Sequence, residues 1–423
     1  MPIIKVLAVV LVVCLAVGLR FVPALRTYQF TAWIMVSVVA SMLYPEWFLA
    51  WSLWGGRIEF DLRNKKLALL VIQFVMFGMG TQMRLQDFLI GEKMAYGVAV
   101  GLLLQFTVMP LVGFTIAQLC GFDPEIGAGI VLVGCCSSGL ASNVMTYIAR
   151  GNLPLSITLT ALATLMAPAV TPAWMKVLAG AEVEVTYFEM MMQIVMIVIV
   201  PIGAAMLHDL LRQVTPRVRT FIVSLAAIAI AWWLASTMGW IAPAATVTDG
   251  AHADAMASQA LAAKGFGIGM SPVLFDLVAA LTFAVTLGVV YHGITRMWAD
   301  VEKVMPVVSM VGIIFFVTIT TAAGRDDLLK IGLVLTLAAA AHNTIGYVLG
   351  YWLSRLCGLD ASSARTVALE VGLQNGGMAS GLASQMGKLA TVGLAPAVFS
   401  PWMNVSGSLL ANHWRRRPVV DSR

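Results

Sequence analysis

The sequence has little charge. Only 11% of its 423 residues are Asp, Glu, Lys or Arg, whereas 60% are hydrophobic. A soluble globular chain carries about 25% charged residues, so the composition excludes an ordinary soluble protein and indicates a membrane protein. The formal net charge is +5, but the basic residues are dispersed in short loops between apolar runs and at the C-terminus, at 415–417. This dispersal fits a polytopic membrane protein and argues against nucleic acid as a partner.

The sequence also lacks the common motifs of enzymes and metal sites. Its five cysteines form no CxxC pair, and its five histidines are scattered without an HExxH motif. These absences exclude a disulfide framework and a zinc site of the usual spacing. A GxSxG motif is absent as well, so no catalytic constellation is visible. We predict neither an enzyme nor a bound cofactor.

Long apolar runs divide the chain into candidate membrane spans. The hydrocarbon core of a bilayer requires about 20 apolar residues per helix. A shorter run at 6–18 opens the chain and fits a short span and a signal peptide equally well. On this template we predict helices near 29–53, 66–82, 93–119, 125–149, 153–178, 185–211, 218–242, 272–297, 304–323, 328–356, 362–386 and 392–414.

The predicted spans form two related sets. Residues 29–178 contain five spans, and residues 185–414 contain five more once an inserted helical hairpin at 213–300 is set aside. An odd number of spans per repeat places the second copy upside down in the membrane, as in the inverted repeats of secondary transporters. The remaining parts are an N-terminal hydrophobic segment, 1–28, and a basic tail, 415–423. We therefore expect an all-α polytopic membrane protein with ten core helices.

The basic residues predict the orientation. The predicted loops at 121–125, 179–184 and 243–269 are poor in Lys and Arg, and they alternate with loops that are rich in them. Cytoplasmic loops carry the excess of basic residues in membrane proteins. We expect a multi-pass protein of the cell (inner) membrane with a cytoplasmic C-terminus.

A single carboxylate, Glu370, lies within a long apolar segment at 368–386. An acid at mid-bilayer costs about 2.5–3.5 kcal/mol, so such a residue indicates a functional site. Gly372, Gly376 and Gly377 predict an interruption of the helix beside it. Backbone carbonyls freed by a break are tolerated in a membrane where they line a cavity. A buried acid beside free carbonyls suits a hard cation, which predicts a cation-coupled carrier.

The first half contains a matching polar centre at 134–160. Ser142 and Asn143 lie near its middle, and Ser156 and Thr160 lie one turn apart on one helix face. Oxygen ligands of this kind suit a hard cation such as Na⁺. Together with Glu370, these four side chains predict a sodium site.

Other polar residues have less specific surroundings. Ser137 and Ser138 are better explained by helix–helix packing, in which small polar residues are common. Gln105 is a lone amide among aliphatic residues and fits either a helix contact or an oxygen ligand. Further amides lie beyond the acid and in the last span, at Gln374, Asn375 and Asn404.

Three segments resemble the bile acid:sodium symporter family. They are GLLLQFTVMP, GLASNVMTYIARGN followed by SITLT, and LEVGLQNGGMASGLA. The resemblance covers nearly the whole chain except the first ~28 residues and the 213–300 insert. It implies ten helices in two inverted repeats, with two crossing, broken helices. It also implies two sodium sites that share Glu370: one formed with Ser142, Asn143, Ser156 and Thr160, the other with Gln105, Val371, Leu373 and Gln374.

The chain departs from this family at two positions. Leu140 stands where members often carry a hydroxyl, and Met403 stands where many carry a histidine. We expect these two residues to line the substrate pocket together with Asn375 and Asn404. The positive N-terminal ends of the half-helices favour an anion there. The predicted function is sodium-coupled symport of a small organic anion across the lipid bilayer by alternating access.

Two alternatives remain open at this point. Arsenite-efflux carriers of related architecture pair a broken-helix acid with a thiol, and Cys135 and Cys136 lie in the corresponding neighbourhood. A receptor or scaffold that transports nothing would leave the buried Glu370 unexplained. Of the two, only the carrier uses the buried acid.

Overall fold

The computed structural model describes residues 2–22, 28–53, 58–88, 92–181, 183–237, 241–243, 268–270, 272–298 and 300–417. The chain forms two compact units. The first consists of Met1–Met79, Gln86–Ile199 and Pro306–Arg423, and the second consists of Gly80–Leu85 and Val200–Met305. The predicted insertion at 213–300 lies within the second unit.

The protein is an all-helical polytopic membrane protein. In the described part of the chain, eight helices are long and apolar enough to cross a bilayer. Two further apolar helices are shorter, Gln29–Leu43 and Pro124–Cys135. Helices and closed barrels are the structures that satisfy every backbone polar group inside a membrane, which explains why apolar sequence of this length becomes helix.

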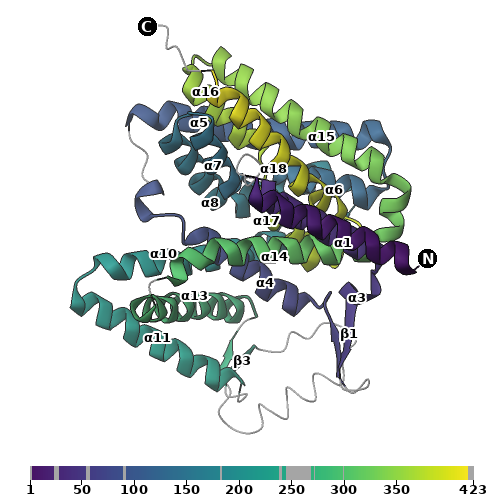
Figure 1. Ribbon diagram of the computed structural model, residues 1–423. Coiled ribbons are helices and arrows are strands. Elements are labelled where there is room, and N and C mark those ends of the chain that lie inside the picture. Colours follow the sequence, from purple (N-terminus) through teal and green to yellow (C-terminus); the bar gives the residue numbers. More distant parts are fainter. Residues whose placement is uncertain are drawn as a thin grey trace. The chain divides into compact units, whose positions relative to one another are not determined.

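The first unit contains most of the helices (Figure 1). Its N-terminal elements are α1 (Pro2–Gly18), η1 (Leu19–Phe21), α2 (Gln29–Leu43), α3 (Glu46–Leu49), β1 (Ala50–Leu53), β2 (Ile58–Asp61) and α4 (Lys65–Gly80), whose last residue is assigned to the second unit. Its middle elements are η3 (Leu85–Phe88), α5 (Glu92–Cys120), α6 (Pro124–Cys135), α7 (Leu140–Ile148), α8 (Leu153–Leu178), α9 (Tyr187–Ile194) and η4 (Val195–Ile199). Its C-terminal elements are α14 (Val301–Ala323), α15 (Arg325–Leu356), α16 (Ala361–Gly372), α17 (Gly376–Gln385) and α18 (Leu394–Arg415). The first residues of α14, up to Met305, are assigned to the second unit.

The long helices α5, α8 and α15 surround the short ones in this unit. Helix α5 packs along α6, α8, α15 and α16, and α15 also packs along α16 and α18. The short helices α6 and α16 are buried along nearly their whole length. Polar side chains on these short helices are therefore shielded from both lipid and water.

Several predicted boundaries agree closely with the structure. The span predicted at 93–119 is α5, and the span predicted at 153–178 is α8. The interruption predicted beside Glu370 separates α16 from α17. The predicted span at 125–149 is likewise two helices, α6 and α7.

The helix predicted at 29–53 is wrong beyond residue 43. Helix α2 ends at Leu43, two residues before Pro45, which fixes its own φ and cannot donate a backbone hydrogen bond. Residues Ala50–Leu53 instead form strand β1, which pairs antiparallel with β2. Trp51 in β1 and Ile58 and Phe60 in β2 are residue types that favour strands.

The predicted helix at 185–211 is also irregular. It consists of α9, a π-helical turn at η4 and α10 (Val200–Gln213). Pro201 follows this turn, and its missing N–H leaves the carbonyl four residues earlier without its helical donor. A local π-bulge is a common response to such a defect in a helix.

The second unit contains α10, α11 (Pro216–Thr237) and α13 (Pro272–Met297). Helix α13 packs along both α10 and α11. The loop predicted at 243–269 lies mostly outside the described residues. Its described ends form two short parallel strands, β3 (Ile241–Pro243) and β4 (Ile268–Met270).

Candidate functional site

Two interrupted helix pairs, α6–α7 and α16–α17, meet at their breaks. Ser138 in the first break pairs with Gln374 in the second as an isolated antiparallel bridge. The backbone N–H of Asn375 donates to the carbonyl of Ser137 at 2.8 Å. These backbone groups lie outside regular helix, and each break therefore satisfies part of the hydrogen-bonding need of the other.

Glycine permits the close packing around the second break. A Cβ on Gly372 would lie 2.2 Å from Cδ1 of Tyr347, and a Cβ on Gly376 would lie 1.9 Å from Oγ of Ser400. Real Cβ atoms do not approach neighbours so closely. The sequence signal that predicted the interruption, a cluster of glycines beside Glu370, thus has a packing reason as well.

The carboxylate of Glu370 lies at the centre of this crossing. Its side chain is 2% exposed. The hydroxyl of Ser156 donates to Oε1 at 2.5 Å, and those of Ser138 and Thr160 donate to Oε2 at 2.5 Å and 2.9 Å. Within the described residues, no Lys, Arg or His forms an ion pair with this carboxylate. The charge is held by neutral hydroxyl groups alone.

All five side chains predicted for the first sodium site come together here. Asn143 Oδ1 lies 2.8 Å from Ser156 Oγ and 3.2 Å from Thr160 Oγ1, and Ser142 Oγ lies 3.3 Å from Thr160 Oγ1. Each hydroxyl has one proton, yet Ser156 and Thr160 each approach both Glu370 and Asn143. Each hydroxyl can therefore donate to only one of these two acceptors, and the oxygen of the other acceptor faces a lone pair of the hydroxyl oxygen. Oxygen lone pairs that face one another in this way create a favourable place for a cation.

The amide pair Gln105 and Gln374 lies beside the same break. Gln105 Nε2 donates to Gln374 Oε1 at 3.0 Å and to the carbonyl of Cys136 at 3.1 Å. Gln374 Nε2 donates to the carbonyl of Val371 at 2.6 Å. Within the described residues, Gln105 Oε1 is buried and has no hydrogen-bond partner. The residues predicted for the second sodium site thus present an unused amide oxygen.

Leu373, the remaining residue of that predicted set, follows α16 directly. Its φ of −97° and ψ of 103° place it in the extended region. The helical ladder therefore ends at this residue, and the carbonyls of the last turn of α16 have no partners within the helix. Two of these carbonyls accept side-chain donors instead, that of Val371 from Gln374 and that of Gly372 from Asn343.

Of the four residues predicted for the substrate pocket, Asn375 and Met403 lie at the second break. Asn375 caps α17 by accepting from the N–H of Met378 at 3.0 Å, while its Nδ2 is buried without a partner among the described residues. Met403 is buried, and its Cε lies 3.9 Å from the Cβ position of Gly376. Leu140 begins α7 and is half-buried. Asn404, also half-buried, donates to the carbonyl of Ser400 at 2.7 Å within its own helix.

Ser138 corrects one expectation from the sequence. Its assignment to helix–helix packing is wrong, because it lies in the break and contacts Glu370 directly. The neighbouring Ser137 lies 3.4 Å from Thr164 and contacts Met378, away from the carboxylate. The sequence carries no clear signal that separates Ser138 from Ser137, because the two serines are adjacent and both precede Gly139.

Asn343 is a further residue that sequence reasoning missed. Its Nδ2 donates to the carbonyl of Gly372 at 2.8 Å, and its Oδ1 accepts from Ser406 at 2.6 Å. The side chain is fully buried. Asn343 thus links the end of α16 to α18 through α15.

The two adjacent cysteines contribute through their backbones. The carbonyl of Cys135 accepts from Thr171 at 2.7 Å, and that of Cys136 accepts from Gln105. Both thiols are fully buried. In the described part of the chain, no three His, Cys, Asp or Glu side chains gather as a metal site.

Comparison with known proteins relates the chain to a family of transporters. The profile of the Sodium Bile acid symporter family matches residues 69–242. The sodium-dependent transporter YocS of Bacillus subtilis is 28% identical over 389 residues, which is 92% of this chain and 91% of that protein. By these matches the chain is similar to the sodium bile acid symporter family. It is accordingly a membrane transporter and not an enzyme.

Other relatives in the family come from eukaryotes. The rice protein named probable sodium/metabolite cotransporter BASS1, chloroplastic, is 29% identical over 92% of this chain and 76% of its own length. The human ileal sodium/bile acid cotransporter is 35% identical, but over only 24% of this chain and 30% of its own length. Similarity to the plant chloroplast protein therefore extends over much more of the chain than similarity to the intestinal bile acid carrier.

Proposed function

We propose that the protein couples the movement of an organic anion to that of Na⁺ by alternating access. The observation that carries this proposal is the buried Glu370 carboxylate, which has only neutral donors among the described residues. A buried charge without a paired ion is strongly unfavourable. A cation entering from solution offsets that cost, and the names of the relatives YocS and BASS1 point to sodium.

The oxygen atoms around Glu370 suit sodium chemically. Ser142, Asn143, Ser156 and Thr160 provide neutral oxygens, and each hydroxyl can donate its proton to an acceptor while a lone pair faces the ion. Hard cations prefer oxygen ligands of this kind. These four residues and Glu370 form the first proposed sodium site.

The second proposed site uses Gln105, Gln374 and the backbone of Val371 and Leu373, again with Glu370. The unpartnered Oε1 of Gln105 supports this assignment, because a buried amide oxygen without a donor costs free energy that a bound cation recovers. Two ions against one carboxylate leave a net positive charge. The site therefore favours an anionic co-substrate.

The anion site is proposed at the second break. The N-terminus of α17 lies there, where unpaired N–H groups and the helix dipole favour a negative group. Asn375 Nδ2 is a buried donor without a partner in the described chain, and it belongs to the residue that caps this helix. We assign Asn375, Leu140, Met403 and Asn404 to this pocket.

The arrangement offers a reason for coupling. Gln374 of the second proposed ion site and Asn375 of the proposed anion site are consecutive, and the Asn375 backbone is bonded to Ser137 across the crossing. A sodium ion that orders Gln374 therefore also orders the donor for the anion. Ordering by the first ligand lowers the cost of binding the second, which is positive cooperativity.

Uptake into proteoliposomes tests the proposal. Radiolabelled organic acids, among them a steroid carboxylate and a short 2-oxo acid, are offered with an inward Na⁺ gradient, with an equal K⁺ gradient, and with a proton gradient alone. We expect uptake of at least one acid to require the Na⁺ gradient. Uptake driven equally by protons would show that Glu370 carries a proton instead. Sodium-independent arsenite export that is lost with Cys135→Ser and Cys136→Ser would favour the efflux carrier.

A further inference from the structure

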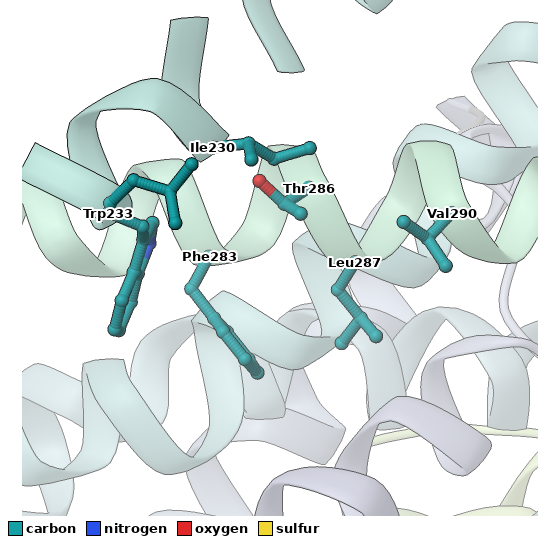
Figure 2. Close-up of a pocket in the computed structure, with 7 residues that line it drawn as sticks. Ile230, Trp233, Phe283, Thr286, Leu287 and Val290 are labelled. Carbon is teal, nitrogen blue, oxygen red and sulfur yellow. The ribbon is translucent and has the colours of Figure 1, made fainter. Parts of the chain in front are cut away.

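An apolar cavity of about 450 Å³ lies between α11 and α13 in the second unit (Figure 2). Of the residues that line it, Thr286 alone carries a hydroxyl, while Trp233, Phe283 and Leu287 provide large apolar surfaces. An ion that leaves water needs oxygen atoms in place of its hydration shell. The lining of this cavity does not supply them, so the cavity is no passage for Na⁺.

The first proposed sodium site is deeply buried in the first unit. Ser156, Thr160 and Glu370 are each at most 2% exposed. Glu370 lies ten positions beyond Asp360, the exposed N-cap of α16, which is about 15 Å along the helix. This distance is about half of the ~30 Å hydrocarbon core of a bilayer. An ion that moves between the site and this end of α16 therefore has a long way to travel without bulk water.

One face of α16 carries a polar stripe along this distance. Ser363, Thr366 and Glu370 are spaced at i, i+3 and i+7, so they lie on the same face of the helix. Asp360 continues the stripe at the exposed end, where its carboxylate accepts from Ser363 Oγ at 2.8 Å. In the described part of the chain, Asp360 forms no ion pair. The stripe therefore begins at the surface with a negative charge that no basic side chain neutralises.

Helix α8 presents a matching stripe to α16. Asn152 at its N-cap, Ser156 and Thr160 follow one another at intervals of four residues. Ser156 and Thr160 both donate to the buried carboxylate. At the start of α8, the backbone N–H of Asn152 donates to Thr366 Oγ1 at 2.7 Å, and Asn152 Nδ2 donates to Ser363 Oγ at 3.3 Å. The two stripes are thus in direct contact at both ends.

Polar atoms also fill the middle of this contact. The carbonyl oxygen of Asn152 lies 3.3 Å from Thr366 Oγ1 and accepts from the backbone N–H of Ser156 at 3.1 Å. Ser156 Oγ in turn lies 3.2 Å from Thr146 Oγ1. A Cβ on Gly151 would lie 2.8 Å from Thr366 Oγ1 and 2.9 Å from Thr146 Cγ2, so glycine lets both threonines approach this point. Polar atoms therefore follow one another at hydrogen-bond distances from the surface to the carboxylate.

The basic residue in this part of α16 points elsewhere. Arg365 lies five positions before Glu370, which is about 140° away around the helix. Its guanidinium donates to the carbonyls of Ala149, Trp414 and Arg417. Its charge is therefore held on another face of the helix than the polar stripe.

We propose that the facing stripes of α8 and α16 form the route by which Na⁺ moves between the first proposed sodium site and the surface at Asp360. The route rests on the proposed function, since it serves the ion that Glu370 is proposed to bind. Oxygen atoms along the stripes replace the water molecules of the ion one after another, and the charge of Asp360 raises the local concentration of Na⁺ at the mouth. The neighbouring Arg355 and Arg365 predict this end of α16 to be cytoplasmic.

Thr366→Val tests the route in the full-length protein, because it removes one oxygen from the middle of the stripe and keeps the branched shape. Release of radioactive Na⁺ into an excess of unlabelled Na⁺, sampled by rapid filtration, gives the dissociation rate, and equilibrium binding gives Kd. We expect release to slow by about 3–10-fold, the effect of one lost hydrogen bond on a barrier, with Kd unchanged. Thr366→Ser keeps the oxygen and should retain the wild-type rate. Thr171→Val is the control, since Thr171 is equally buried on α8 but donates to the carbonyl of Cys135.

Asp360→Asn tests the mouth of the route. Asparagine caps a helix as well as aspartate does, so α16 keeps its N-cap while the charge is lost. We expect association of Na⁺ to slow by about fivefold at ~0.01 M ionic strength. The effect should largely disappear at ~1 M choline chloride, which screens the charge. A change that only damaged the fold would not respond to salt in this way. Asp300→Asn, which removes an exposed carboxylate from the second unit, should leave association unchanged.

The results separate failure of the route from failure of the sodium site. A wild type that binds Na⁺, with unchanged rates in both Thr366→Val and Asp360→Asn, would overturn the route alone. A Kd for Thr366→Val that rises as much as its dissociation rate changes would assign Thr366 to the bound state and also overturn the route. A wild type that binds no radioactive Na⁺ would refute the proposed function itself, and the route with it.

Discussion

The hydroxyl of Ser156 donates a 2.5 Å hydrogen bond to the carboxylate of Glu370, although 214 positions separate the two residues in sequence. The contact joins the start of α8 to the end of α16, one element from each half of the chain. Ser156 lies in the first turn of α8, and Glu370 lies in the last turn of α16. Because this contact is buried away from solvent, a cation that binds to Glu370 should change both the stability of the protein and its transport activity.

Sodium should stabilise the folded protein where potassium does not. A ligand that binds only the folded state adds RT ln(1 + [L]/Kd), about 2.7 kcal/mol at a hundredfold excess over Kd. Thermal unfolding of purified protein in NaCl and in KCl at equal ionic strength measures the difference. Indistinguishable melting curves would count against both proposed sodium sites.

Glu370→Gln should abolish sodium-dependent uptake and the sodium-dependent shift in melting temperature. The amide keeps the shape of the side chain and is easier to bury than a charge, so the variant should still fold. Asp300→Asn removes an exposed carboxylate that is paired with Lys303 and provides the control. Normal sodium-driven uptake by Glu370→Gln would refute the central role of this acid.

The sequence identified Glu370 because one acid in a long apolar segment has few structural explanations. Ser138 could not be recognised in the same way, since serine is common in membrane helix contacts and its role depends on where two breaks cross. The contact between Gln105 and Gln374 likewise depends on tertiary packing across 269 positions. Hydropathy also extended the helix at 29–53 too far, because apolar aromatic residues suit strand β1 as well as a span.

Ser138→Ala should raise the Na⁺ concentration that gives half-maximal transport by about 10–100-fold. Hydrogen bonds that orient a ligating carboxylate commonly have effects of this size on metal affinity. The matched control is Ser137→Ala, because Ser137 is equally buried and adjacent but contacts Thr164 and Met378 instead. Uptake measured against Na⁺ concentration separates the two. Equal curves for the two variants would show that the Ser138 contact does not affect the ion.

Asn343→Ala should destabilise the protein by about 1–3 kcal/mol, the cost of leaving a buried carbonyl without its donor. The carbonyl concerned is that of Gly372 at the end of α16. Asn412→Ala is the control, since its amide bonds only within α18 to Ser408. Chemical unfolding in detergent compares the two variants. If both lose the same stability, Asn343 is not the residue that holds this break in place.

Leu140→Thr should shift substrate preference toward smaller, more polar acids while sodium affinity stays unchanged. Leu140 begins α7 at the first break, and Met403 lies beside Gly376 at the second. Apolar residues at these two positions separate homologous substrates by only about 1–3 kcal/mol, whereas a pocket built around a hydrogen bond discriminates more strongly. We therefore expect the unmodified protein to prefer an anion with a sizeable apolar body.

Competition of a steroid carboxylate and a short hydroxy acid for sodium-driven uptake, in the wild type and in Leu140→Thr, measures the shift. Leu140→Ile controls for packing, because it keeps the volume and adds no hydroxyl. A wild type that selects the short hydroxy acid would contradict this assignment of the pocket, even with both sodium sites intact.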